Sequence, residues 1–215
     1  MGNALTRTFE LGDPPDYEPD PSRSVAARAA HQGLDPFVLA YELLLGDEGR
    51  ALLYWPFENY SDGNLEAVRS MLCADHTVSG LSDGGAHVGT ICDASFPTFL
   101  LTHWVRDRSR GDRLPLEQVV RNQTRDTARA VGLHDRGVLA PGLRADINVV
   151  DLDRLRLRPP EIVHDLPAGG RRLVQTVDGY RHTFVAGEET YTDGTWTGAT
   201  PGRVLRGGAS RRRPM

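Results

Sequence analysis

The strongest indication of topology is the stretch Thr77-Val78-Ser79-Gly80-Leu81-Ser82-Asp83-Gly84-Gly85-Ala86-His87, in which an aspartate follows a short apolar run. Such a run is typical of a buried strand, and the two glycines permit a tight turn after the carboxylate. Upstream, Arg50–Trp55 predicts another buried strand. Between these runs, apolar residues recur at helical spacing at Leu65, Val68, Met71 and Leu72. The order strand, helix, strand predicts an α/β fold with a parallel sheet and Asp83 at a strand end.

Composition narrows the class of protein and its partners. The 215 residues are 39% hydrophobic, enough for a real core, and 25 basic residues against 29 acidic ones give a net charge of −4. This balance offers no positive field for nucleic acid or an anionic membrane, so a small-molecule substrate is the expected partner. Met1–Leu11 lacks the apolar segment of a signal peptide, and no run of about 18 apolar residues follows. Two cysteines, Cys73 and Cys92, suit reduced thiols, and we expect a cytoplasmic protein.

The first part of the chain predicts a surface loop followed by two helices. Gly12–Pro21 is rich in proline and acid and predicts a loop that wraps the surface. Ser24–Gln32 predicts a helix that ends at Gly33, and Asp35 predicts the N-cap of a second helix over Pro36–Leu45.

The second part predicts further helices and then a region rich in strands. An amphipathic helix that packs on the sheet is predicted by the spacing of Phe96, Phe99, Leu100, His103 and Trp104. More helix is expected over Leu116–Asn122 and Asp126–Val131. After Gly137, turns at Pro141-Gly142, Asp178-Gly179, Ala186-Gly187 and Asp193-Gly194 separate short strands at Ile147–Val150, Leu173–Val177 and Thr183–Val185.

A longer motif carries a resemblance to a known family. Gly137-Val138-Leu139-Ala140-Pro141-Gly142-Leu143-Arg144-Ala145-Asp146-Ile147-Asn148-Val149-Val150-Asp151 resembles the closing signature of the amidohydrolase superfamily. Together with Ser82–His87, Arg125–Arg129 and His164–Arg172, it is similar to the N-acyl-D-amino-acid deacylase, or D-aminoacylase, branch. The resemblance extends from about Leu11 to Arg206.

The resemblance implies an architecture. It is the C-terminal part of a metal-dependent hydrolase (β/α)8 barrel, followed by a small β-sandwich segment. Residues 1–135 would hold the last strands and helices of an incomplete barrel, 136–206 the sandwich segment and 207–215 a disordered tail. Arg50–Trp55 would then be the seventh strand of the barrel and Thr77–Ser82 the eighth.

The resemblance also implies a reaction. In the family, the aspartate that Asp83 matches takes a proton from a metal-bound water and passes it to the leaving nitrogen, and it can also touch the metal. One carboxylate beside a Lewis acid serves both steps of amide hydrolysis. Zinc is the cofactor expected for the intact enzyme, and an N-acyl amino acid is the expected substrate. His87 either orients Asp83, contacts the substrate or only bonds its own loop, and the sequence leaves these open.

Several other polar residues have simpler interpretations. His103 falls on an apolar stripe and predicts a satisfied core histidine, while Asp146 predicts a residue that holds a turn or strand by hydrogen bonds. Asn59–Gly63, after the expected seventh strand, is a candidate for shaping the substrate pocket. Arg171 and Arg172 are expected to be solvated, because adjacent side chains on a strand point to opposite faces.

Most expected metal ligands have no counterpart in the chain. It contains no His-x-His pair, and its histidines stand at positions 31, 76, 87, 103, 134, 164 and 182. Two strands cannot close an eight-stranded barrel. We therefore expect a fragment from which the N-terminal portion is missing, or a chain whose barrel is completed by another chain. Two alternatives to the deacylase stay open: a non-catalytic remnant or assembly partner, and a hydantoinase- or dihydroorotase-like cyclic amidohydrolase.

Overall fold

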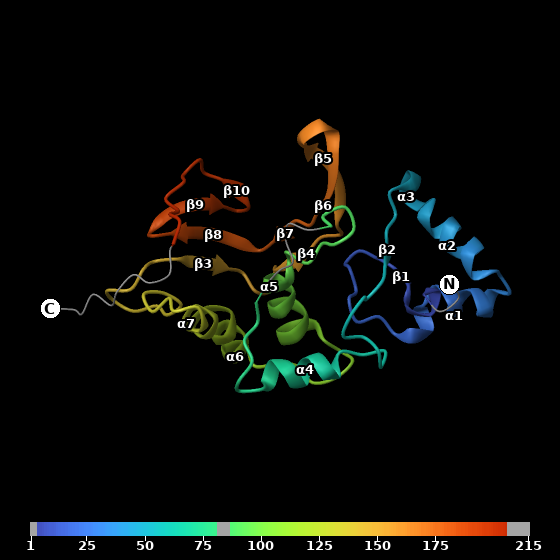
Figure 1. Cartoon of the computed structure of the whole chain (residues 1–215), viewed down its shortest axis with the longest axis horizontal. Coiled ribbons are helices and arrows are strands. Elements are labelled where there is room, and N and C mark those ends of the chain that lie inside the picture. Colours follow the sequence, from blue (N-terminus) through green and yellow to red (C-terminus); the bar gives the residue numbers. More distant parts are fainter. Residues whose placement is uncertain (1–3, 81–86, 206–215) are drawn as a thin grey trace.

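The computed structural model describes residues 4–80 and 87–205, with helices and strands concentrated in different parts of the chain (Figure 1). Helices α1 to α7 lie between Val25 and Ala130, and strands β3 to β10 lie between Ile147 and Trp196. Single turns of 3₁₀ helix are found at Leu5–Arg7, Pro21–Arg23 and Pro167–Gly169. The structure thus mixes helices and strands, as the sequence predicts.

The first two helices begin and end where their capping residues predict. Helix α1 spans Val25–Gln32; the Ser24 hydroxyl accepts from the backbone N–H of Ala27, and Gly33 ends the helix in the left-handed conformation. Helix α2 spans Pro36–Leu44 and is capped by the Asp35 carboxylate. The left-handed turn α3 follows over Gly46–Gly49. Helices α1 and α2 share a small core made of Val25, Ala29, Leu39 and Ala40.

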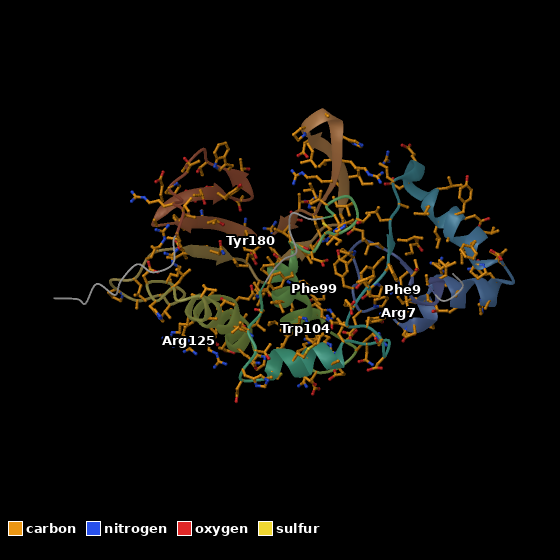
Figure 2. The ribbon with its side chains drawn as sticks, in the orientation of Figure 1. Arg7, Phe9, Phe99, Trp104, Arg125 and Tyr180 are labelled. Carbon is orange, nitrogen blue, oxygen red and sulfur yellow. The ribbon has the colours of Figure 1, made fainter. Side chains whose placement is uncertain are left out.

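A second core gathers around Trp104, in the centre of the molecule (Figure 2). The predicted helix from Phe96 is confirmed as α5, Phe96–Phe99, which continues as a π-helix over Leu100–Asp107. Its buried residues pack on partly buried side chains just before and within α4, Glu66–Cys73, and on Val119 of α6, rather than on a sheet. Helix α6, Leu116–Arg121, runs through a π-helical stretch, Asn122–Asp126, into α7, Thr127–Ala130.

The strands after Gly137 form antiparallel pairs. One sheet has the order β10-β9-β8-β3, from Thr195–Trp196, Glu188–Thr192, Tyr180–Val185 and Ile147–Val150. Two further pairs join β4, Arg156–Leu157, to β7, Val177–Asp178, and β5, Glu161–Leu166, to β6, Gly170–Val174. The predicted turns at Ala186-Gly187 and Asp193-Gly194 have positive φ at both residues, as a tight hairpin requires.

The predicted parallel strands are not found in the described residues. Only Leu53–Tyr54 of Arg50–Trp55 is a strand, β2, and it pairs antiparallel with β1, Phe9–Glu10. Thr77–Gly80, the described part of the second predicted strand, forms no strand. A parallel strand needs a parallel neighbour, but the backbone of β2 is hydrogen-bonded to the antiparallel strand β1 instead. Closure of a barrel is therefore not observed.

The chain exposes more surface than expected for a compact monomer of its mass, and large apolar side chains are part of it. The chain exposes 14532 Å², whereas a folded monomer of 23.6 kDa exposes about 9,800 Å². The residues outside the described ranges would account for at most about 3,000 Å² of this difference, the area of a fully extended chain of that length. An excess of about 1,700 Å² over the expected area remains. Large side chains contribute to it, among them Phe37 (57% exposed), Tyr41 (65%) and Phe57 (69%).

Over the residues that the structure describes, every helix is too short or too polar to cross a bilayer.

Candidate functional site

The predicted catalytic residue and its neighbours fall at the edge of the described structure. Asp83 and Ser82 lie outside the described residues. His87 is exposed and adopts a φ of 50°. Its carbonyl accepts from the backbone N–H groups of Thr90 (2.8 Å) and Ile91 (3.0 Å), which closes a turn over His87–Ile91. The backbone of His87 therefore builds this turn, and the roles of its imidazole and of Asp83 stay predictions.

This turn is attached to the β5–β6 hairpin. The backbone N–H of Leu173 in β6 donates to the carbonyl of Val88 at 2.7 Å. Farther along, the Ser95 hydroxyl donates to the side-chain carbonyl of Gln175, just after β6. Two bonds from well-separated points of the chain thus set the position of the segment that follows the predicted catalytic loop.

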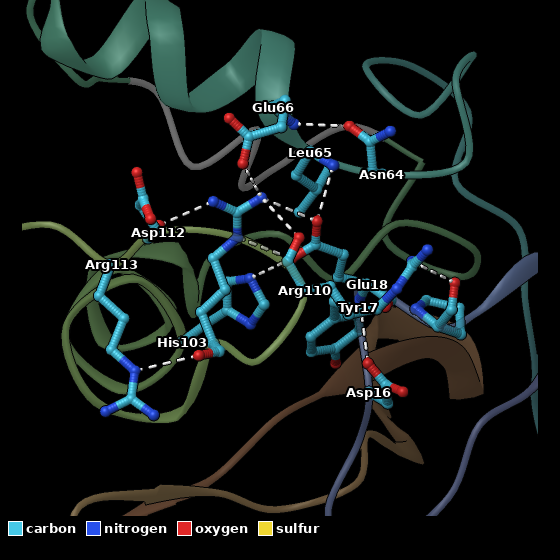
Figure 3. A network of polar contacts seen from close by, with 12 residues as sticks. Asp16, Tyr17, Glu18, Asn64, Leu65, Glu66, His103, Arg110, Asp112 and Arg113 are labelled. Atoms are coloured by element: carbon cyan, nitrogen blue, oxygen red, sulfur yellow. Dashed lines mark hydrogen bonds and ion pairs between the residues drawn. The ribbon is translucent and has the colours of Figure 1, made fainter.

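A buried ion pair lies at the centre of the polar network (Figure 3). Glu18 accepts from Arg108 through Nε (2.9 Å) and Nη2 (3.0 Å), and also from the backbone N–H of Leu65 (2.8 Å). The side chains of Arg108 and Glu18 are 0% and 2% exposed. His103 Nε2 lies 3.0 Å from Glu18 Oε2. Gly12–Pro21, predicted to wrap the surface, instead carries Glu18 into the interior, because a buried cation there needs a carboxylate.

Burial and charge determine the protonation states in this network. Burial alone raises the pKa of Glu18, but hydrogen bonds from Arg108 and Leu65 outweigh it, so the pKa lies below its usual value. Burial lowers the pKa of His103, and the nearby carboxylate of Glu18 opposes this only in part. At neutral pH the imidazole is therefore neutral and donates its Nε2–H to ionised Glu18. His103 is a satisfied core histidine, as predicted, and it stacks on Phe99 with ring centroids 4.6 Å apart.

Two arginines join the network to the rest of the fold. Arg108 lies 4.6 Å from the centroid of Trp104 and bonds Glu66 at 2.8 Å. Arg110 Nη1 donates to the hydroxyl of Tyr60 and to the carbonyls of Glu18, Pro19 and Gly63. Tyr60 is buried and donates to the carbonyl of Pro19. Within Asn59–Gly63, Tyr60 thus serves as an internal anchor, and the segment does not line the cavity described below, so its role in shaping a substrate pocket stays a prediction.

A cavity of about 990 Å³ opens between the N-terminal loop, the helix around His103 and the strands β4, β7 and β8. Seven arginines line it, and six of them pair with carboxylates: Arg106, Arg108, Arg110, Arg156, Arg158 and Arg181. Its charge is therefore largely neutralised. His87 is not in the lining. In the described structure, the cavity and the turn that follows Asp83 are therefore separate features.

The described residues do not fit a zinc ion. Over residues 4–80 and 87–205, no three His, Cys, Asp or Glu side chains gather closely enough to hold one. Glu18 and His103 form one histidine–carboxylate pair, but the Arg108 guanidinium occupies the same carboxylate and would repel a cation. His182 and Glu189 form another such pair, without a third ligand among the described residues. No step of a reaction is therefore routed through a metal.

Asp146 and Arg172 both form ion pairs in the strand-rich part. Asp146 accepts from the backbone N–H of Ala186 (2.8 Å) and from Arg144 and Arg136, which confirms its role in holding a turn. Arg172 is not merely solvated, since it makes two bonds to Asp165 at 2.7 and 2.6 Å. Its neighbour Arg171 is exposed and makes no ion pair within the described part of the chain.

Comparison with known proteins identifies the family. Residues 10–191 match the amidohydrolase family. Since the match covers most of the chain, this protein belongs to that family, which confirms the resemblance at this level.

Individual relatives match shorter stretches. An imidazolonepropionase of Ruegeria sp. (strain TM1040) is 52% identical over 42 residues, 20% of this chain and 10% of that protein. A 5-methylthioadenosine/S-adenosylhomocysteine deaminase of Desulfitobacterium hafniense is 41% identical over 71 residues, 31% of this chain and 16% of that protein. The matched stretches thus span a tenth to a sixth of these relatives.

Solved structures of D-aminoacylase are similar over more of the chain. One, a variant in complex with copper chloride, is 24% identical with a TM-score of 0.48, covering 93% of this chain and 37% of that one. Another D-aminoacylase, described as defining a novel subset of amidohydrolases, has a TM-score of 0.46 at the same identity, covering 91% and 37%. A likeness this remote carries no argument about the chemistry of this chain.

Proposed function

We propose that this chain is the C-terminal part of an amidohydrolase that hydrolyses the amide bond of an N-acyl amino acid, with an N-acyl-D-amino acid as substrate. The observation that supports it most is the family match over residues 10–191. Within the described residues, the His87–Ile91 turn, which follows Asp83 in the sequence, is bonded to the β5–β6 hairpin.

The proposed reaction assigns one proton transfer in each direction to Asp83. Water attacks the acyl carbon, and the carboxylate of Asp83 accepts the proton that the water loses as the new C–O bond forms. The same carboxyl group then gives this proton to the nitrogen as the C–N bond breaks. The products are a carboxylate and a free amino acid. The zinc expected from the resemblance would need ligands from outside the described residues, and no step is assigned to it. We place the protein in the cytoplasm.

The excess surface supports a second part of the proposal, a further polypeptide that covers the apolar faces of this chain. An excess of about 1,700 Å² or more exceeds the roughly 800 Å² that one partner buries in a standard interface. A dye that fluoresces on apolar surfaces should therefore bind strongly to the 215-residue chain by itself. A monomer in light scattering that binds no dye would contradict this part.

The proposed chemistry is tested by Asp83→Asn in the complete protein. We expect hydrolysis of N-acetyl-D-methionine to fall at least 100-fold, since positioned acid–base groups contribute about 10²–10⁴, with an unchanged circular dichroism spectrum. Asp75→Asn, at an exposed aspartate, is the matched control. Activity retained in Asp83→Asn would remove Asp83 from the reaction.

A cyclic amidohydrolase of the hydantoinase or dihydroorotase type is the second candidate. It is favoured by the 52% identity to an imidazolonepropionase, whose name denotes an imidazolone ring. Hydrolysis of hydantoin or dihydroorotate but not of N-acetyl-D-methionine would select it. A protein that hydrolyses none of these and holds no metal after purification would be the non-catalytic remnant.

A further inference from the structure

The β5–β6 hairpin brings one arginine to the turn that follows the predicted catalytic loop. The Leu173–Val88 backbone bond joins β6 to this turn, and Figure 1 shows β6 beside the green segment of the turn. Arg171 Nε lies 3.8 Å from the position that a Cβ on Gly89 would take. The guanidinium therefore lies over the backbone of a residue that has no side chain to displace it.

Arg171 differs from its neighbour in how its charge is used. Adjacent residues of a strand face opposite sides, and Arg172 meets Asp165 on one side in a two-bond pair. On the other side, Arg171 meets no carboxylate of the described residues. Among the described residues, its charge is therefore unpaired on the face that approaches Gly89. The cavity arginines differ in this respect, because six of those seven are already paired.

We propose that Arg171 is a specificity-determining residue that binds the carboxylate of the substrate beside the His87–Ile91 turn. This inference rests on the proposed function, because an N-acyl amino acid carries a free carboxylate close to the amide bond that breaks. A guanidinium binds a carboxylate through two parallel N–H···O bonds, which fixes the orientation as well as the charge of the ligand. Arg171 acts in recognition and takes no part in proton transfer.

The bond between Leu173 and Val88 gives this role a structural basis. It holds the hairpin and the turn in one relative position, so that an anion held by Arg171 would lie next to the turn. His87, the first residue of the turn, is also exposed. A substrate whose carboxylate is replaced by a neutral amide would lose the contact with Arg171 and keep every other one.

The test compares N-acetyl-D-methionine with N-acetyl-D-methioninamide in the complete protein. In Arg171→Gln we expect the KM for the acid to rise 10- to 100-fold, as for loss of a charged hydrogen-bonded contact, with kcat changed less than threefold and the KM for the amide unchanged. Arg171→Lys should recover part of the loss. Arg154→Gln, at another exposed arginine that makes no ion pair within the described residues, is the control and should change neither substrate.

Calorimetric binding of the same two compounds separates this inference from the proposed function. If the wild-type protein hydrolyses neither compound, the proposed function fails, and binding still decides the role of Arg171. Tighter binding of the acid than of the amide in wild type, lost in Arg171→Gln, supports the role. Equal binding of the acid by both proteins, or an equal loss for both compounds, overturns it.

Discussion

Ion pairs between arginine and carboxylate side chains are buried in the helical part of this molecule and exposed in the strand-rich part. In the helical part, the Glu18–Arg108 pair is nearly sealed from solvent and joins three distant segments. In the strand-rich part, pairs such as Arg158–Asp178 and Arg172–Asp165 lie on the surface with side chains 41–56% exposed. Exposed pairs contribute about 0–1 kcal/mol, whereas removal of one partner of a buried pair costs about 3–5 kcal/mol.

The strand-rich part depends instead on backbone geometry. Its hairpins close through residues with positive φ, and at Gly179 the chain passes so close to Leu155 that a Cβ would lie 2.6 Å from the Leu155 Cα. Leu155 itself is completely buried. The contrast shows that the stabilisation from an ion pair depends on its burial. Where ion pairs are exposed, tight turns can contribute to stability instead.

The largest effect is expected from breaking the buried pair. Glu18→Gln leaves buried Arg108 with only the half-exposed Glu66 as counter-charge and should lower the free energy of unfolding by up to about 3–5 kcal/mol in urea titrations. Asp178→Asn, which breaks an exposed pair, is the control and should cost less than about 1 kcal/mol. Equal losses in the two variants would erase the contrast between the two parts.

The second prediction concerns the close approach in the strand-rich part. Gly179→Ala adds a Cβ against backbone atoms at a φ of 101° and should destabilise the chain by about 2–3 kcal/mol, measured by thermal unfolding. Gly194→Ala is the matched control, because its φ is also positive, at 77°, but no heavy atom lies within 4 Å of the added Cβ. The control should lose only about 1 kcal/mol. If Gly194→Ala loses as much, strain rather than crowding explains the site.

A smaller effect should follow from pH in the helical part. The pKa of His103 in the folded chain lies below its unfolded value of about 6.5, so the unfolded chain binds more protons between the two values. The stabilisation is complete above about pH 6.5 and is lost as the pH falls through the folded pKa. Glu18, whose folded pKa is also lowered, acts in the same direction below about pH 4.3.

The groups that act on His103 are Glu18, Arg108 and Asp16. Urea midpoints between pH 8 and 4 measure the loss. His103→Gln should flatten the part of the curve near pH 6 and leave the acidic part. A wild-type midpoint that is constant from pH 7 to pH 5 would contradict the prediction.

The smallest effect is expected at the Asp146 turn. Asp146→Ala removes the acceptor of the Ala186 N–H and should cost about 1 kcal/mol in urea titrations, as a typical net hydrogen bond does. Asp165→Ala, which removes only the exposed partner of Arg172, should cost less still. A larger loss for Asp165→Ala would mean that the β5–β6 hairpin depends on that surface pair.

Local features were predictable because they depend on neighbours in sequence. Ser24 and Asp35 mark the starts of α1 and α2, since a cap bonds an amide two or three residues away. The turns at Ala186-Gly187 and Asp193-Gly194 follow from residue types that tolerate positive φ. Nothing near Glu18 in the sequence reveals that Arg108 is its partner, 90 residues away.

The amino-acid sequence by itself determined the helices with their caps, the tight turns and the membership of the amidohydrolase family, because each rests on short-range preferences or on a contiguous motif. Only the tertiary structure decided that the proline-rich loop enters the core, that β2 pairs antiparallel with β1, and that Arg171 lies over Gly89. These features are tertiary contacts between segments that are distant in the sequence. Local preferences allow many such contacts equally, and burial, charge pairing and backbone hydrogen bonding select among them.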